Sequence, residues 1–207
     1  NDIKHELSTL LLVNGHPNII KIYDNFIIRT TSGNSLYVII TEYCQYGNLH
    51  EYSSNHYIIN QKMQYQIFFQ VLQAIKFIHD KGMSHGDIKS QNILIDENHS
   101  VKICDFGFSK HISDNTMGYK KGTKNYAAPE LFYPEAYDIL SADVWAIGIT
   151  FYEIRYHKFP FSDHNYVPPQ FNQDDKFQYF FRMCTNTNPD LRAKINELIE
   201  NDIFSII

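Results

Sequence analysis

Residues 85–107 constrain this chain more than any other stretch. His85-Gly86-Asp87-Ile88-Lys89-Ser90-Gln91-Asn92 places a carboxylate, an ammonium and an amide within six residues, and Asp105-Phe106-Gly107 begins thirteen positions after Asn92. Between them, the apolar segments 93–95 and 101–103 flank turn-forming residues, which predicts two short paired strands. Loops held by strands commonly carry functional groups. We therefore predict a site for metal-bound phosphates on these loops.

Composition and charge argue against several other functions. The 207 residues carry a formal charge of -5, so the basic excess of a nucleic-acid-binding protein is absent. Apolar runs such as 10–13 and 38–40 are far shorter than the roughly 18 residues of a membrane span. The three cysteines (Cys44, Cys104 and Cys184) form no CxxC pair, which argues against a zinc site or a disulfide framework. We expect an intracellular, cytoplasmic protein without nucleic-acid or membrane partners.

Apolar periodicity divides the chain into a strand-containing first part and a helical second part. Residues 1–14 have the spacing of an amphipathic helix, and 19–28 and 36–41 read as an antiparallel hairpin around turn formers. The pattern changes from strand to helix near Gly47. Helices are then predicted at 61–81, with Gly82 as a left-handed cap, and at 141–156, 175–184 and 189–201.

The order of motifs resembles that of the eukaryotic protein kinases. Asp87 and Asn92 have the spacing of H-R-D-x-x-x-x-N, 105–107 reads D-F-G, and Gly122-Thr123-x-x-Tyr126 precedes the A-P-E at 128–130. The resemblance covers nearly the whole chain. It implies an α+β, protein-kinase-like two-lobe fold, with 1–46 as a partial small β lobe and 47–207 as a mainly helical large lobe.

The resemblance also implies chemical roles, with ATP and Mg²⁺ as cofactors and proteins as substrates. Asp87 would orient the substrate hydroxyl and accept its proton, and Lys89 would neutralise charge on the transferred phosphoryl group. Asn92 and Asp105 would hold Mg²⁺ through hard oxygen ligands. Lys89 two positions after Asp87, together with Thr123 before A-P-E, indicates serine or threonine acceptors.

Nucleotide-binding and structural residues follow from the same resemblance. The nucleotide set is Glu6 as partner of the ATP-anchoring lysine, Thr41 as gatekeeper, the backbone of Glu42 and Cys44 for adenine, Leu94 beneath that ring, and Cys104 beside the site as a candidate for covalent ligands. The structural set is a hydrophobic spine of Leu10, Ile22, His85 and Phe106 anchored by Asp143, and a buried ion pair of Glu130 with Arg192.

Simpler interpretations stand beside several of these roles. Glu6 alone reads as a solvated helix residue, and Asp143 could merely offset a helix dipole. His85 and Phe106 could be ordinary core residues. Cys104 reads equally as a small buried hydrophobe.

Three departures from the family pattern qualify the resemblance. No glycine-rich strand pair and no lysine strand precede Glu6, which predicts a truncated domain that binds ATP weakly. Gly86 replaces the arginine of H-R-D, as in non-RD kinases, so activation by phosphorylation through that arginine is not expected. Ser109, Ser113, Thr116 and Tyr119 nevertheless lie in the activation segment. The stretch before Arg192 is short, and 165–170 replaces much of a substrate-proximal helix.

The sequence thus predicts a serine/threonine protein kinase that transfers the γ-phosphoryl of Mg-ATP to protein hydroxyls. The alternative is a pseudokinase or truncated scaffold that binds partners without catalysis. The complete set of Asp87, Lys89, Asn92 and Asp105 favours the enzyme, and the missing strands favour the scaffold. A small-molecule kinase is disfavoured by Gly122-Thr123 and by the A-P-E motif.

Overall fold

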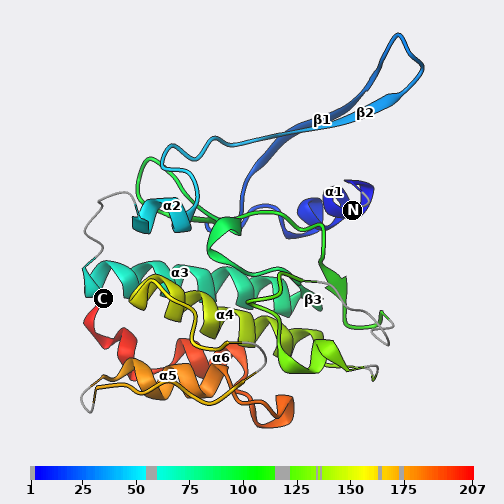
Figure 1. The fold of residues 1–207 in the computed structure, drawn as a ribbon. Coiled ribbons are helices and arrows are strands. Elements are labelled where there is room, and N and C mark those ends of the chain that lie inside the picture. The colour runs from blue at the N-terminus through cyan, green and yellow to red at the C-terminus, as the bar shows by residue number, and fades with distance from the viewer. Residues whose placement is uncertain are drawn as a thin grey trace.

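The computed structural model describes residues 3–54, 60–114, 122–133, 135, 137–162, 165–172 and 175–207. It has an α+β architecture, with a strand-rich part and a helical part, as the sequence predicts (Figure 1). The described helices are α1 (Ile3–Val13), α2 (Leu49–Ser54), α3 (Gln61–Asp80), α4 (Ile139–Tyr156), α5 (Phe177–Cys184) and α6 (Ile195–Ile199). The described strands are β1 (Ile22–Arg29), β2 (Ser35–Thr41), β3 (Met83–Ser84), β4 (Ile93–Ile95), β5 (Val101–Ile103) and β6 (Lys110–His111). No helix in these ranges is long and apolar enough to cross a membrane.

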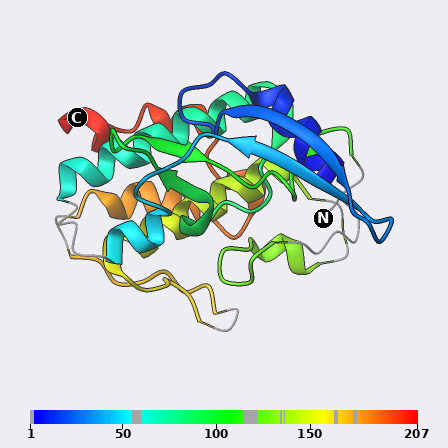
Figure 2. The same cartoon turned by 90° about the horizontal axis from the view of Figure 1, so that it is seen from above.

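The predicted antiparallel hairpin is formed by β1 and β2. Its register runs from Ile22 opposite Thr41 to Arg29 opposite Ser35, and its far end extends away from the rest of the molecule (Figure 1). Seen from above, α1 lies beside the hairpin (Figure 2). The first strand begins at Ile22 and not at Ile19, because Ile19 and Ile20 pair with Ile103 of β5. This short contact ties the base of the hairpin to the centre of the molecule.

The helical part is built around α3 and α4. Fourteen residues of α4, from Ile139 to Ile154, are buried, which confirms a helix that is apolar nearly all round. Phe68 of α3 stacks on Phe151 of α4 with ring centroids 3.8 Å apart. Asn60 caps α3 by accepting a hydrogen bond from the Met63 amide, and the predicted left-handed residue, Gly82, has φ +70°. These helices form the rigid base beneath residues 85–107.

Several short elements depart from the predicted pattern. The pair β4–β5 is antiparallel as predicted, but β3–β6 and α2 were not predicted, because strands of two residues and a helix of six show no clear periodicity. The helix predicted at 175–184 begins at Phe177, where the Asp175 carboxylate accepts a hydrogen bond from the Phe177 amide. The helix predicted at 189–201 is shorter in the structure: a 3₁₀ turn (Pro189–Leu191) comes first, α6 covers only Ile195–Ile199, and a further 3₁₀ turn (Asp202–Ile206) follows. Arg192 lies between the first turn and α6 in extended backbone, from which its side chain reaches Glu130.

Candidate active site

Asp143, near the N-terminal end of α4, fixes the start of the catalytic segment. Its carboxylate accepts hydrogen bonds from the amides of His85 (2.8 Å) and Gly86 (2.9 Å), and it lies 3.0 Å from His79 Nε2. Asp143 is only 2% exposed, so these partners account for its charge inside the protein. The anchoring role predicted for Asp143 is therefore confirmed. An isolated interaction with the helix dipole does not explain this geometry.

His85 connects the two motifs that the sequence singles out. Its Nδ1 accepts a hydrogen bond from the Asp87 amide (3.2 Å), so Nε2 carries the proton and donates to the Cys104 carbonyl (3.0 Å). The imidazole also packs on Phe106 with ring centroids 5.1 Å apart. Leu10, Ile22, His85 and Phe106 are all buried, as a spine requires. The His85 ring thereby links the segment that contains Asp87 to the segment that contains Asp105.

Asp87 lies at the centre of a hydrogen-bond network. Its carboxylate accepts from Lys89 Nζ (2.5 Å), from the amide (3.1 Å) and hydroxyl (2.8 Å) of Thr123, and from Asn92 Nδ2 (3.2 Å). Burial alone would raise the pKa of Asp87, but the hydrogen bonds from Lys89 and Thr123 and the charge of Lys89 outweigh it and lower that pKa. Asp87 is therefore held as a carboxylate able to orient a hydroxyl group.

Asn92 and Asp105 present oxygen atoms suited to a hard cation. Asn92 Nδ2 donates to the Asp87 carbonyl (2.9 Å) and carboxylate, which leaves its Oδ1 without a partner within the described ranges. Within the same described ranges, the only hydrogen bond that the Asp105 carboxylate accepts is a long one from the Gly107 amide (3.3 Å). No cluster of three or more His, Cys, Asp or Glu side chains occurs among the described residues. The Asn92 Oδ1 atom and the Asp105 carboxylate suit Mg²⁺, which binds through one or two protein groups together with phosphates and water.

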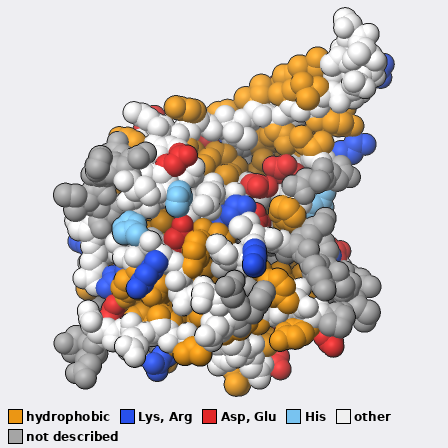
Figure 3. Space-filling model, viewed as in Figure 1, with side chains coloured by type: hydrophobic (Ala, Val, Ile, Leu, Met, Phe, Trp, Pro, Cys, Tyr) orange, Lys and Arg blue, Asp and Glu red, His pale blue; other side chains and the backbone are white. Residues whose placement is uncertain are grey.

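Glu6 of α1 faces this site from the opposite side. Burial and then the negative charge of Asp105 raise the pKa of Glu6. No lysine or arginine forms an ion pair with either carboxylate in the part of the chain that the structure describes. Figure 3 shows acidic and basic side chains gathered below the hairpin on this face.

The predicted adenine-binding residues follow β2. The Glu42 amide donates to the Lys21 carbonyl (2.9 Å), and its carboxylate pairs with Lys102 (3.1 Å), which fixes the backbone at this point. The Cys44 amide has no hydrogen-bond partner among the described residues and is available to an acceptor such as a purine ring nitrogen. Thr41 is exposed, and Leu94 of β4 is half-buried. The nucleotide-binding roles of these residues stay predictions.

Cys104 is poorly placed for reaction with covalent ligands. Its thiol donates a weak hydrogen bond to the Asn92 carbonyl (3.4 Å), and burial raises its pKa to about 12. Burial likewise raises the pKa of Cys44 to about 11. Because the thiolate is the reactive form, a raised pKa favours the less reactive thiol form of both side chains at neutral pH. The geometry favours the interpretation of Cys104 as a small buried hydrophobe.

Gly86, which stands in place of the H-R-D arginine, is in close contact with the residue after D-F-G. Its φ is +82°, and a Cβ added at Gly86 would lie 2.3 Å from the carbonyl oxygen of Phe108. A side chain at this position requires the backbone to move. The absence of a side chain therefore brings the catalytic segment and the start of the activation segment together directly. Of the four hydroxyl-bearing residues noted in the activation segment, Thr116 and Tyr119 lie outside the described residues.

The predicted ion pair of Glu130 with Arg192 is confirmed. Arg192 NH1 donates to Oε1 at 2.6 Å and NH2 to Oε2 at 3.0 Å, which is a bidentate arrangement. Arg192 also donates to the carbonyls of Ser141 and Asn186, and its guanidinium lies 5.2 Å from the Trp145 ring. These contacts tie the A-P-E motif to the base of α4.

One polar network escaped the reasoning from sequence. Glu153, buried on α4, accepts from the hydroxyls of Tyr126 (2.7 Å) and Ser90 (3.1 Å) and lies 2.9 Å from His50 Nδ1. Burial and the Glu153 charge raise the pKa of Tyr126. The available signal was an acid in the second half of a helix that is apolar nearly all round, since a buried charge requires partners. The network holds the catalytic segment against the segment that contains Tyr126.

A comparison with known protein families identifies the chain. The profile described as "Protein kinase domain" matches residues 1–205. The chain belongs to this family. This protein kinase domain is 29% identical to CBL-interacting protein kinase 9 of Oryza sativa subsp. japonica, an alignment that covers 98% of the chain and 46% of that protein. It is 31% identical to NUAK family SNF1-like kinase 1 of Homo sapiens (95% and 30%) and to CBL-interacting serine/threonine-protein kinase 5 of Arabidopsis thaliana (97% and 44%).

The relatives agree with the class predicted from the sequence. They are named as kinases, and one is named as a serine/threonine-protein kinase. The kinase domain spans less than half the length of these curated relatives.

Proposed function

We propose that the protein is a serine/threonine protein kinase that transfers the γ-phosphoryl of ATP to hydroxyl groups of protein substrates. The observation that carries this proposal is the set of contacts around Asp87. Lys89, Asn92 and Thr123 all donate to its carboxylate, so the side chain has one orientation and keeps its negative charge. A substrate hydroxyl beside this carboxylate would be oriented for attack and would find an acceptor for its proton.

The residues present fit Mg²⁺ and ATP as cofactors. Asn92 Oδ1 and the Asp105 carboxylate would hold the metal, which supplies charge neutralisation at the phosphates. Lys89, which donates to both Asp87 and Thr123, would stabilise charge near the transferred group. The free amide of Cys44 would bind the adenine ring. Among the described residues, neither Glu6 nor Asp105 forms an ion pair with a lysine or arginine.

A substitution at Asp87 tests the proposed reaction. In the full-length protein, the wild type should transfer labelled phosphate from Mg-ATP to serine or threonine of a protein substrate. Asp87→Asn keeps the size of the side chain and one oxygen atom, which has two acceptor positions. It loses the negative charge and the group that accepts the proton. We expect its rate to fall about a hundredfold or more, measured as incorporated phosphate and analysed for the phosphorylated amino acid.

The matched control for this experiment is Asp80→Asn, the same chemical change at an exposed carboxylate of α3 that pairs with Lys76. We expect the control to keep the wild-type rate. Equal rates for Asp87→Asn and the wild type would contradict the catalytic role of Asp87. A folded wild-type protein without any transfer would favour the scaffold. The cytoplasmic location and the division into 1–46 and 47–207 stay predictions.

A further inference from the structure

His99 has a backbone conformation that is uncommon for a residue with a side chain. It lies in the turn that joins β4 to β5, and its φ is +58°. The Asp96 amide donates to the Ser100 carbonyl (3.0 Å) and the His99 amide to the Asp96 carbonyl (3.0 Å), which closes the turn. Glycine would adopt this left-handed conformation without steric cost. A histidine here therefore indicates that the side chain has a role that offsets the strain.

The His99 ring contacts two tyrosines that follow β2 in the chain. It stacks on Tyr46, with ring centroids 4.7 Å apart and ring planes 8° apart. Its Nδ1 atom lies 2.8 Å from the hydroxyl oxygen of Tyr52 in α2, which is a hydrogen-bond distance. Tyr52 is only 1% exposed, so it gives the exposed imidazole a fixed point of attachment. We refer to His99, Tyr46 and Tyr52 as the aromatic clamp.

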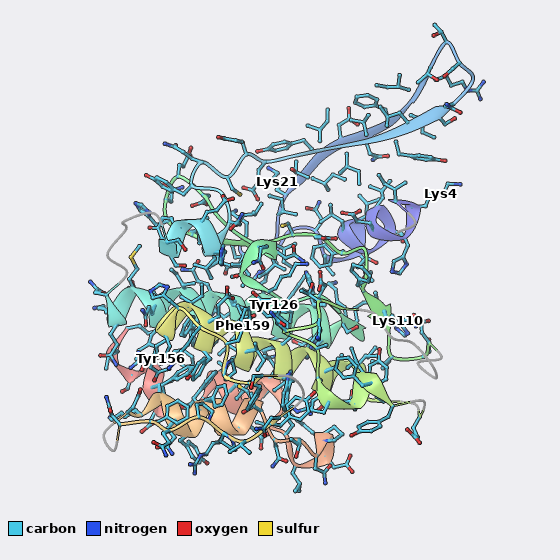
Figure 4. All side chains as sticks on the ribbon, in the orientation of Figure 1. Lys4, Lys21, Lys110, Tyr126, Tyr156 and Phe159 are labelled. Carbon is cyan, nitrogen blue, oxygen red and sulfur yellow. The ribbon has the colours of Figure 1, made fainter. Side chains whose placement is uncertain are left out.

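The aromatic clamp lies at one end of residues 42–47, the segment proposed to bind adenine. At the other end, the Glu42 amide donates to the carbonyl of Lys21 (2.9 Å), which Figure 4 labels at the base of the hairpin. At the clamp end, the Tyr46 amide donates to the carbonyl of Ile95 in β4 (3.1 Å). The segment is therefore held at both ends, by the hairpin and by the β4–β5 pair with its turn.

The position of the Cys44 amide depends on these two points of attachment. The Gly47 amide donates to the Cys44 carbonyl (3.2 Å), so residues 44–47 form a turn that carries the Tyr46 side chain. The stack on His99 restrains that side chain and, with it, the turn. A segment that is restrained beforehand loses less conformational freedom when a ligand binds. The clamp thus favours ligand binding at Cys44 without touching the ligand.

We propose that His99 is a positioning residue for nucleotide binding, and that through Tyr46 and Tyr52 it holds residues 42–47 in the conformation that accepts the adenine ring. The inference rests on the proposed function, because it assumes the nucleotide site. It concerns only the adenine end of that site and requires no phosphoryl transfer. The two proposals can therefore fail separately.

Binding of ADP and of pyrophosphate to the full-length protein tests the aromatic clamp. Both ligands are titrated with Mg²⁺ present, and calorimetry gives each dissociation constant. His99→Gly removes the ring, and the variant should fold because glycine suits the left-handed backbone. We expect it to bind ADP about fivefold more weakly, the effect of losing one aromatic contact. Pyrophosphate has no adenine ring, so its affinity should stay within about twofold of the wild-type value.

Two further variants distinguish positioning from a general effect on the fold. His99→Phe keeps a ring for the stack on Tyr46 and should bind ADP within about twofold of the wild type. His157→Gly is the matched control, because His157 is also an exposed histidine with a positive φ (+50°), but it lies at the end of α4. The control relieves the same kind of strain outside the clamp and should keep the wild-type affinity for ADP.

Coupling between Tyr46 and His99 is the most specific consequence of the clamp. Tyr46→Leu should also weaken ADP binding about fivefold. Adding His99→Gly to this variant should weaken binding by less than about twofold more, because the stack is already lost. Losses that multiply in the double variant would show that the two residues act independently, and would overturn the clamp.

The outcomes separate the two proposals. Equal ADP affinity of His99→Gly and the wild type, or an equal loss of affinity for pyrophosphate, would overturn the clamp even if the protein phosphorylates its substrates. The expected pattern in a protein that transfers no phosphate would support the clamp and contradict the proposed kinase reaction. A folded wild-type protein that binds no ADP would contradict both.

Discussion

At the scale of single residues, the contact of Gly86 with Phe108 is the feature that sets this kinase domain apart. In the family pattern an arginine stands here, and its guanidinium is suited to a phosphate on the activation segment. In this chain the amide of Gly86 is held by Asp143, and the absence of a Cβ admits the Phe108 carbonyl. The two segments are therefore joined at this position by backbone packing.

We predict that Gly86→Ala destabilises the protein by about 2–3 kcal/mol, from the left-handed backbone and the close approach of a carbonyl oxygen. Urea unfolding measures the change in free energy. Gly15→Ala is the matched control, because Gly15 also has a positive φ (+99°) but nothing lies within 4 Å of an added Cβ. The control should lose only about 1 kcal/mol. Equal losses for both variants would show that the contact with Phe108 has no energetic consequence.

At the scale of elements, the Glu130–Arg192 pair joins two 3₁₀ turns that lie far apart in the sequence. Glu130 belongs to a 3₁₀ turn (Pro129–Phe132) and Arg192 follows another, and such turns have weaker internal hydrogen bonds than an α-helix. The Arg192 side chain is fully buried, so its charge depends on Glu130 and on backbone carbonyls. Long-range pairing thus holds the A-P-E motif in place.

Glu130→Gln should lower the free energy of unfolding by about 3 kcal/mol, because it leaves a buried guanidinium without a counter-charge. The control is Lys76→Gln, which removes an exposed ion pair with Asp80 on α3 and should cost at most about 0.5 kcal/mol. Both changes are measured by urea unfolding. A loss for Glu130→Gln as small as that of the control would mean that the carbonyls alone stabilise Arg192.

At the scale of the whole molecule, stability is unevenly distributed. Residues Tyr23 to Arg29 of β1 are exposed, whereas most of α4 is buried against α3 and α5 (Figure 1). The amides of the hairpin therefore open to solvent at low cost, while those of α4 require the helical part to unfold.

We predict that hydrogen–deuterium exchange in this 207-residue chain is slowest in α3 and α4 and faster by orders of magnitude in β1 and β2. Mass spectrometry of peptic fragments gives the order. In the full-length protein the hairpin should become more protected if further strands cover it, and α4 should stay unchanged. A hairpin as protected as α4 in the 207-residue chain would contradict this distribution of stability.

The sequence by itself determined the features that depend on local spacing. The positions of Asp87, Lys89, Asn92 and Asp105 identified the chemical set, and the apolar period of 61–81 gave α3 nearly to its last residue. Gly82 marked the end of that helix because a residue just past a helix end often adopts a positive φ, which glycine does at little cost. Each of these signals lies within a few residues of the chain, where steric preference and periodicity act directly.

Only the tertiary structure decided the features that join distant residues. The two-residue strands β3 and β6 exist because they pair with each other, and 189–201 is broken because Arg192 must reach Glu130. Three other features likewise depend on segments far apart in sequence. They are the partners of Glu153, the approach of Phe108 to Gly86, and the pocket that Trp145 lines together with other aromatic residues. Local propensity is weak for such short segments, so the free energy of burial and of long-range hydrogen bonds determines their structure.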